Sequence, residues 1–142
     1  MFRKVTDSFY ASPQIGIDAV AEAKAMGITQ IINNRPEGES EDQVPGPQVE
    51  AAAREAGIDY CAIPVGHGGF SQAQVDAMAQ ALAQSAGPVL AYCRSGTRST
   101  LLWSLARAKS GDNPGVIAAQ AAAAGYDVSP IRQIIDMLAG GQ

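Results

Sequence analysis

One heptapeptide of the chain has the composition of a reactive-cysteine site. Residues 93–99 read Cys-Arg-Ser-Gly-Thr-Arg-Ser and follow the apolar run 89–92. Where a strand ends and a helix begins, backbone N–H groups and the positive end of the helix dipole favour a bound anion. Because Arg94 and Arg98 add positive charge there, we expect the Cys93 thiol to ionise readily and to act as a nucleophile.

The alternative is that Cys93 is a structural cysteine, since free cysteine is among the most buried residue types. That alternative suits Cys61 better, because its neighbours 58–63 include no cation and no glycine loop. Two arginines, Gly96 and three hydroxyl residues within seven positions are a poor composition for a core. We therefore predict that Cys93 is catalytic and Cys61 structural, with a disulfide between them left open.

Length and charge limit the classes of protein that the chain can belong to. Its 142 residues suit one domain, taken as 1–142. The net charge of −4 argues against nucleic acid or an anionic membrane as the main partner. One histidine and two distant cysteines make a metal site improbable, and no dinucleotide or nucleotide fingerprint indicates a cofactor. Without a signal peptide or an apolar run of transmembrane length, we expect a cytoplasmic protein.

Alternating helix and strand patterns predict an α/β fold with a mainly parallel sheet. Apolar residues recur with helical spacing in the segments 49–56, 75–82 and 131–138. Glycines 27, 57 and 87 each stand before a strand-like run, as a left-handed helix cap would. The predicted strands are 28–33, 58–64 and 89–93, with a short one at 8–12. A helix is expected over 97–109, followed by helices separated at 111–114 and 125–127.

Two loops should share the edge of the sheet with Cys93, because the carboxyl ends of parallel strands meet there. The first, 34–42, is polar and rich in acids, and we expect its carboxylates to be solvated surface. Arg35 is better placed, since it directly follows a strand. The second, 66–71, holds His67, which either lines the pocket or belongs to a flexible turn before a helix capped by Ser71.

Three segments together resemble a known family: Ile31-Ile32-Asn33-Asn34-Arg35-Pro36, Ile63-Pro64-Val65 and the Cys93 loop. They are similar to the phosphatase-like domain family associated with beta-lactamase hydrolase-like proteins, which has the fold of dual-specificity protein phosphatases. The resemblance extends from Phe9 to the C-terminal helices. It implies a central, mostly parallel sheet of four or five strands flanked by helices, with the cysteine loop as an anion pocket.

The loop departs from the phosphatase pattern in two ways. Four residues, not five, separate Cys93 from Arg98, and Tyr92 stands where a histidine is usual. The six residues Cys-Arg-Ser-Gly-Thr-Arg resemble instead the loop of rhodanese-type sulfurtransferases. A shorter loop offers one N–H donor fewer to a phosphoryl group. The loop Pro64-Val65-Gly66-His67-Gly68 also lacks the Asp that such phosphatases use as general acid, and His67 is the available substitute. Sulfur transfer needs little acid help, because its leaving groups depart as anions.

Our leading expectation from the sequence is therefore a sulfurtransferase. Cys93 would take sulfane sulfur from thiosulfate or a persulfide and pass it to a thiol acceptor. Arg98 and the loop N–H groups would hold the anion, Arg94 would face the incoming substrate, and Thr97 or Ser99 would hydrogen-bond the sulfur; Ser95 and Gly96 complete the loop. The alternative is a phosphatase acting through a Cys93 phosphocysteine. A non-catalytic anion-binding module is the third class, disfavoured because a thiolate is prone to oxidation.

Overall fold

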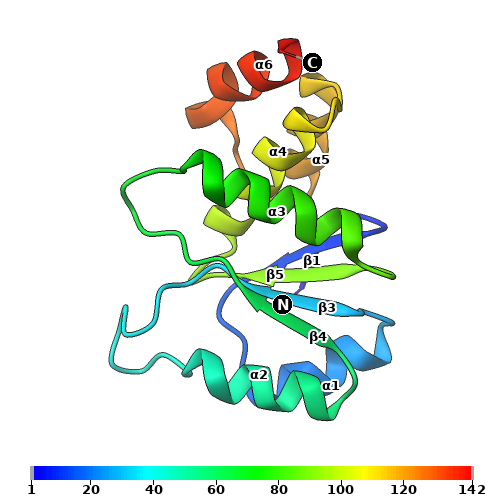
Figure 1. Cartoon of the computed structure of the whole chain (residues 1–142), viewed down its shortest axis with the longest axis vertical. Coiled ribbons are helices and arrows are strands. Elements are labelled where there is room, and N and C mark those ends of the chain that lie inside the picture. The colour runs from blue at the N-terminus through cyan, green and yellow to red at the C-terminus, as the bar shows by residue number, and fades with distance from the viewer. Residues whose placement is uncertain (1, 142) are drawn as a thin grey trace.

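A five-stranded sheet between two layers of helices forms the domain (Figure 1). The structure is a computed structural model that describes residues 2–141. The strand order is β1-β2-β5-β3-β4, and every neighbouring pair is parallel except the hairpin of β1 and β2. The strands are β1 Arg3–Thr6, β2 Phe9–Ser12, β3 Gln30–Asn33, β4 Asp59–Ala62 and β5 Val89–Tyr92. The predicted α/β fold with a mostly parallel sheet is confirmed.

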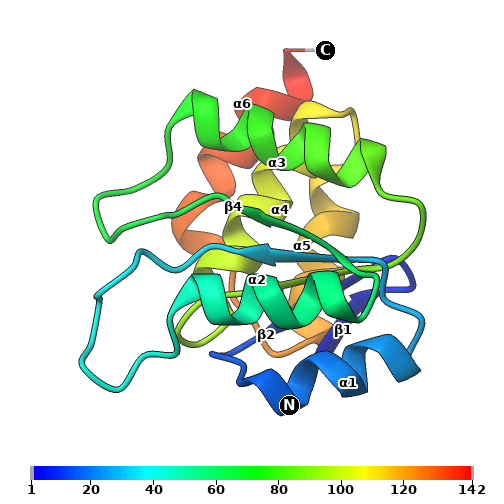
Figure 2. The same ribbon diagram turned by 60° about the horizontal axis from the view of Figure 1, so that its bottom comes forward.

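The helices cover both faces of the sheet (Figures 1 and 2). One face carries α1 Ile17–Ala25 and α2 Gly46–Glu55. The other carries α3 Gln72–Gln84, α4 Thr97–Lys109, α5 Pro114–Ala123, the short 3-10 helix η1 Ser129–Ile131 and α6 Arg132–Gly140. Within residues 2–141, no helix has the length and apolar character needed to cross a bilayer.

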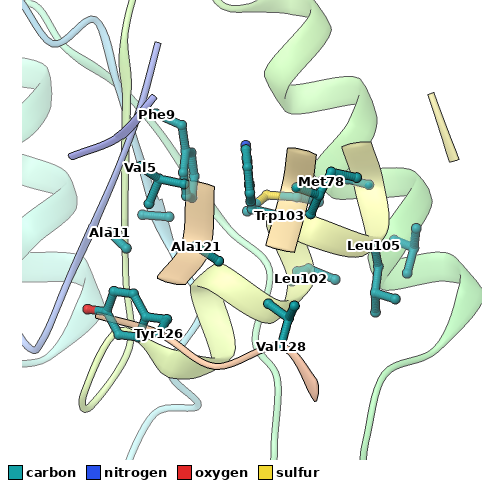
Figure 3. Packing of buried hydrophobic residues seen from close by; sticks show 14 of the residues in the cluster. Val5, Phe9, Ala11, Met78, Leu102, Trp103, Leu105, Ala121, Tyr126 and Val128 are labelled. Carbon is teal, nitrogen blue, oxygen red and sulfur yellow. The ribbon is translucent and has the colours of Figure 1, made fainter. Parts of the chain in front are cut away.

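Strands β3 and β5 bury side chains on both faces, which explains their nearly continuous apolar sequence. Because successive side chains point to opposite faces, Ile32 and Ala91 pack beneath α4, whereas Ile31 and Leu90 pack beneath α1 and α2. Helix α4 is the centre of the larger core, shown in Figure 3. There the rings of Phe9 and Trp103 stack with their centroids 5.3 Å apart.

Two of the three predicted glycine caps are confirmed. Gly27 and Gly57 have φ of 83° and 77° and follow the ends of α1 and α2. A residue with a β-carbon is strained in this left-handed conformation, so glycine ends the helix there. The predicted helix start at Thr97 is also confirmed.

The prediction that Gly87 caps a helix is wrong. Helix α3 ends at Gln84, and Ser85 is already extended, with ψ of 134°. Pro88 follows Gly87 and disfavours helical backbone at the residue before it. A β-carbon at Gly87 would lie 2.9 Å from Thr29 Cγ2, so the glycine serves close packing instead of a cap.

Strand β1 was not predicted from the sequence. Its first two residues, Arg3 and Lys4, are exposed, and four residues are too few to show an alternating pattern. The hairpin with β2 forms it, and Arg3 Nη1 donates to the carbonyl of Ala124, 3.1 Å away in a distant part of the chain.

The sheet brings the predicted functional loops to one edge. Ser12 and Asn33 are both in register with Tyr92, and Asn33 is in register with Ala62, so four parallel strands end side by side. Figures 1 and 2 show the β3–α2 and β4–α3 connections leaving the sheet on the same side. Side chains from the four following loops can therefore meet around Cys93.

Candidate active site

Cys93 directly follows β5 and is completely buried. Its N–H donates to the carbonyl of Ser12 over 3.3 Å, which continues the pairing of β2 with β5. Its Sγ accepts the N–H of Gly96 over 3.1 Å. The sulfur is therefore turned into the loop that begins α4, not into the interior away from that loop.

Gly96 shapes the loop, because only a glycine fits its position. Its φ of 94° lies in the left-handed region, and a β-carbon there would lie 3.3 Å from the Ser12 carbonyl carbon and collide with the Tyr126 hydroxyl. Tyr126, from the connection after α5, donates its hydroxyl hydrogen to the carbonyl of Ser95 over 3.2 Å. This support behind the loop was not identified from the sequence.

The hydroxyl residues of the loop fall into two groups. Ser95 and Thr97 are exposed; their hydroxyls are 3.0 Å apart, and the Thr97 N–H donates to Ser95 Oγ. Ser99 is fully buried, and its Oγ has no hydrogen-bond partner within the described residues. Arg94 is exposed to solvent. Of the loop hydroxyls, Ser99 is therefore the one with an unused donor inside the protein.

Arg98 is held in place by an acidic side chain from the β3–α2 loop. Its Nη1 and Nη2 each donate over 2.8 Å to one oxygen of Glu39, and Nη1 also donates over 2.6 Å to the carbonyl of Val65. The pKa of Arg98 is raised by the hydrogen bond to Glu39 and by the nearby charge of Cys93. These contacts use three of the five N–H donors of Arg98. The remaining Nε–H and Nη2–H are not engaged by Glu39 or Val65, and a hydrogen bond with the Cys93 sulfur also raises the pKa of Arg98.

Arg35 lies beside the same carboxylate and is almost completely buried. Its Nε donates to Glu39, its Nη1 to Gln14 and its Nη2 to Ser40, each over 2.9 Å. All three nitrogens are thus paired with protein atoms. Arg35 fixes the β3–α2 loop and holds Glu39 in place, but it offers little hydrogen-bonding capacity to a ligand.

The expectation that the acidic loop is solvated surface is wrong for Glu39. Its side chain is 14% exposed, because both guanidiniums draw it inward. The hydrogen bond from Arg98 is the largest cause that lowers its pKa to about 2. Burial, the second-largest cause, opposes it, and the hydrogen bond from Arg35 and the charges of both guanidiniums lower the pKa further. The sequence did contain one signal, since Arg35 and Glu39 are four residues apart in a short loop.

His67 lies at the rim of this cluster. Its Nε2 is 3.4 Å from Glu39 Oε2, while 77% of its side chain is exposed. The expected turn before a capped helix is also present, because Ser71 and Gln74 form a capping box at the start of α3. The structure thus places His67 beside Glu39, while its role in the pocket stays a prediction.

Cys61 lies apart from this cluster. Strand β3 separates β4, which carries Cys61, from β5, and both cysteines are free. Cys61 is half-buried at the edge of the larger core and accepts a hydrogen bond from Gln30 Nε2 over 3.6 Å. Burial raises the pKa of its thiol, as expected for a structural cysteine.

The fold and the junction of β5 with α4 define a phosphatase-like α/β domain with a cysteine-based site. The model of the family "Beta-lactamase hydrolase-like protein, phosphatase-like domain" matches residues 1–110, and the chain belongs to this family. It is 41% identical over 87 residues to a beta-lactamase hydrolase-like protein of Agrobacterium fabrum, covering 61% of this chain and 20% of that protein. A relative from Xylella fastidiosa is 34% identical over 107 residues, covering 75% and 25%. The chain therefore matches about a fifth to a quarter of these relatives' length.

Solved structures agree with this assignment. The candidate phosphatase nma1982 from Neisseria meningitidis has a TM-score of 0.83 at 34% identity, with 96% of both chains covered. A candidate phosphatase from Shewanella putrefaciens has a TM-score of 0.77 at 22% identity, covering 99% of this chain and 91% of the other. The second likeness establishes the fold alone.

Proposed function

We propose that the domain is a phosphatase that hydrolyses phosphoric monoesters through a Cys93 phosphocysteine. The observation that carries the proposal is the fixation of Arg98 beside the Cys93 sulfur. Glu39 and the Val65 carbonyl hold one end of the guanidinium. The Nε–H and the second Nη2–H, which Glu39 and Val65 do not engage, lie along another edge of its plane beside Cys93, where they suit two oxygens of a phosphoryl group.

In the first step the Cys93 thiolate attacks phosphorus and the bond to the ester oxygen breaks. The charge that develops on the equatorial oxygens is stabilised by Arg98 and the loop N–H groups. In the second step water attacks phosphorus and the P–S bond breaks, which returns the thiolate.

Phosphorylated ligands of structures with this fold support the same substrate class. PTPMT1 in complex with PI(5)P has a TM-score of 0.75 at 10% identity, and TpbA of P. aeruginosa in complex with pTyr has 0.67 at 16%. At these identities the likeness is one of fold, so it favours phosphoric monoesters in general and selects neither ligand.

The proposal is tested with an activated aryl phosphate. We expect turnover that disappears in Cys93→Ser and persists in Cys61→Ser, because Cys61 lies on another strand, away from the loop. Phosphate release and trapping of the phosphoenzyme would be measured. Absence of Cys93-dependent turnover at every pH from about 5 to 8, the range in which histidine changes charge, would overturn the proposal.

Sulfur transfer is the second candidate, favoured by the four-residue spacing between Cys93 and Arg98. In that reaction the thiolate attacks the outer sulfur of thiosulfate, sulfite leaves, and Cys93 carries a persulfide. A thiol acceptor then attacks the outer sulfur and the thiolate returns. The shorter loop offers fewer N–H donors to a bound group, and a single terminal sulfur needs fewer of them than three phosphoryl oxygens.

The intact mass of the protein after thiosulfate treatment decides this second candidate. Fully reduced protein should gain one sulfur atom that a thiol acceptor removes, and Cys93→Ser should gain none. An unchanged mass, with Cys93 shown beforehand to be reduced, would exclude sulfur transfer from this donor.

A further inference from the structure

We propose that His67 is the general acid and base of phosphoryl transfer at Cys93. Its imidazolium gives a proton to the ester oxygen as the P–O bond breaks. The resulting neutral imidazole then takes a proton from the water that attacks the phosphocysteine, which restores the imidazolium as the P–S bond breaks. This inference rests on the proposed phosphatase function and names the residue that completes it.

The loop that carries His67 is tied to the catalytic arginine. The Val65 carbonyl, two residues before His67, accepts the Arg98 Nη1–H, and the Val65 N–H donates to the carbonyl of Asn34 over 2.9 Å. His67 Nε2 is 3.4 Å from Glu39 Oε2, the oxygen that also binds Arg98 Nη1. One carboxylate oxygen thus separates the imidazole from the guanidinium that would hold the phosphoryl group.

Other acidic groups near the site are unsuited to give a proton. The pKa of Glu39 is about 2, so its carboxyl is ionised at neutral pH. Glu37 accepts the Gly46 N–H at the start of α2. Tyr126 already donates to the Ser95 carbonyl, and burial raises its pKa. His67 is the only titratable residue in the segment 63–72.

The backbone around His67 is rich in glycine and has open space around it. Gly66, Gly68 and Gly69 surround it, and a β-carbon at any of them would meet no atom within 4 Å. Because the imidazole is 77% exposed, it has room to rotate toward an ester oxygen above Arg98. Catalytic hydrogen bonds often form only once the substrate is bound.

The leaving group decides whether His67 acts as an acid. A poor leaving group such as phenolate needs a proton, whereas 2,4-dinitrophenolate departs without one. We expect His67→Gln to lower kcat/KM at least about 100-fold on phenyl phosphate and less than about threefold on 2,4-dinitrophenyl phosphate. Added imidazole should restore part of the phenyl phosphate turnover in His67→Ala. Gln72→Ala, an exposed change five residues along, is the matched control.

A purely structural histidine would give a different result. Equal losses on both substrates, or no loss on either, would overturn the role of His67 while leaving Cys93-dependent turnover intact. If the parent protein showed no Cys93-dependent turnover of either substrate, both the phosphatase function and the role of His67 would be overturned. The two failures are therefore distinguishable.

Discussion

Glu39 is shared by two guanidiniums, and this sets the charge of the site. Arg35 and Arg98 carry two positive charges against the one negative charge of Glu39. The same loop also carries Glu37, Glu41 and Asp42, and Asp42 lies in the field of Arg35 and Arg94. The two buried guanidiniums are a local source of positive charge, since the chain as a whole carries −4. An anionic substrate can be attracted to this edge of the sheet without the protein having a basic surface.

Removing the charge of Glu39 should lower the stability of the fold. Glu39→Gln keeps the shape but leaves two largely buried guanidiniums without a carboxylate. We expect the free energy of unfolding to fall by roughly 1–3 kcal/mol. Breaking a fully buried ion pair costs about 3–5 kcal/mol, and the loss here should be smaller because Glu39 keeps some contact with water. Urea denaturation measures it, and an unchanged midpoint would contradict the structural role.

The lowered pKa of Glu39 predicts how the stability of the fold depends on pH. The folded-state pKa of Glu39 is about 2, below its ordinary value of 4.5. A lowered folded-state pKa contributes stability that is fully present above about pH 4.5 and is lost as the pH falls toward 2. The difference in unfolding free energy between parent and Glu39→Gln should therefore shrink across this window. A difference that stays constant would show that the carboxylate charge is not responsible.

At the scale of elements, the junction of β5 with α4 positions Cys93 and Arg98. The strand brings Cys93 to the sheet edge, Gly96 turns its N–H onto the sulfur, and the first turn of α4 carries Arg98. The N-terminal end of α4 thus serves both the loop and the larger core. The residues of α4 that face the core are buried, so the helix is fixed against the sheet. The loop that begins α4 therefore has little freedom to move relative to the sheet.

Gly96→Ala should disturb this junction. The left-handed φ costs a residue with a β-carbon about 1–2 kcal/mol, and the collision with the Tyr126 hydroxyl adds to it. We expect a loss of more than about 2 kcal/mol in unfolding free energy, partly recovered when Tyr126→Phe is added. Gly68→Ala, where a β-carbon meets no atom within 4 Å, is the control. Equal stability of both single variants would disprove the explanation.

At the scale of the molecule, one sheet joins two hydrophobic cores. Because β3 and β5 contribute side chains to both, we expect the two faces to unfold together. Unfolding followed by fluorescence of Trp103, the only tryptophan, should coincide with unfolding followed by far-UV circular dichroism. Two separate transitions would show that the helical layers are independent.

Truncation in the larger core should lower stability without changing cooperativity. Leu102 is fully buried within α4, so Leu102→Ala should remove about 2–5 kcal/mol while leaving the urea m-value unchanged. Val116 is about half exposed, and Val116→Ala should cost less than about 0.5 kcal/mol. Similar losses in the two variants would contradict the assigned core.

The sequence by itself determined the features that depend on neighbouring residues. Helical spacing, the glycines at 27 and 57 and the junction at Cys93 act over a few positions, so the α/β order and the start of α4 could be predicted. The same local signal gave a wrong prediction of a helix cap at Gly87, where close contact with Thr29 from another part of the chain requires glycine.

Only the tertiary structure decided which side chains surround Cys93. Glu39 and Arg98 are 59 residues apart, and Tyr126 is 31 residues from the carbonyl that it supports. No local pattern encodes such pairs, because they form only when parallel strands bring their carboxyl ends together. The sequence suggested a cysteine with an arginine, and folding added a carboxylate that holds the arginine and lies beside His67.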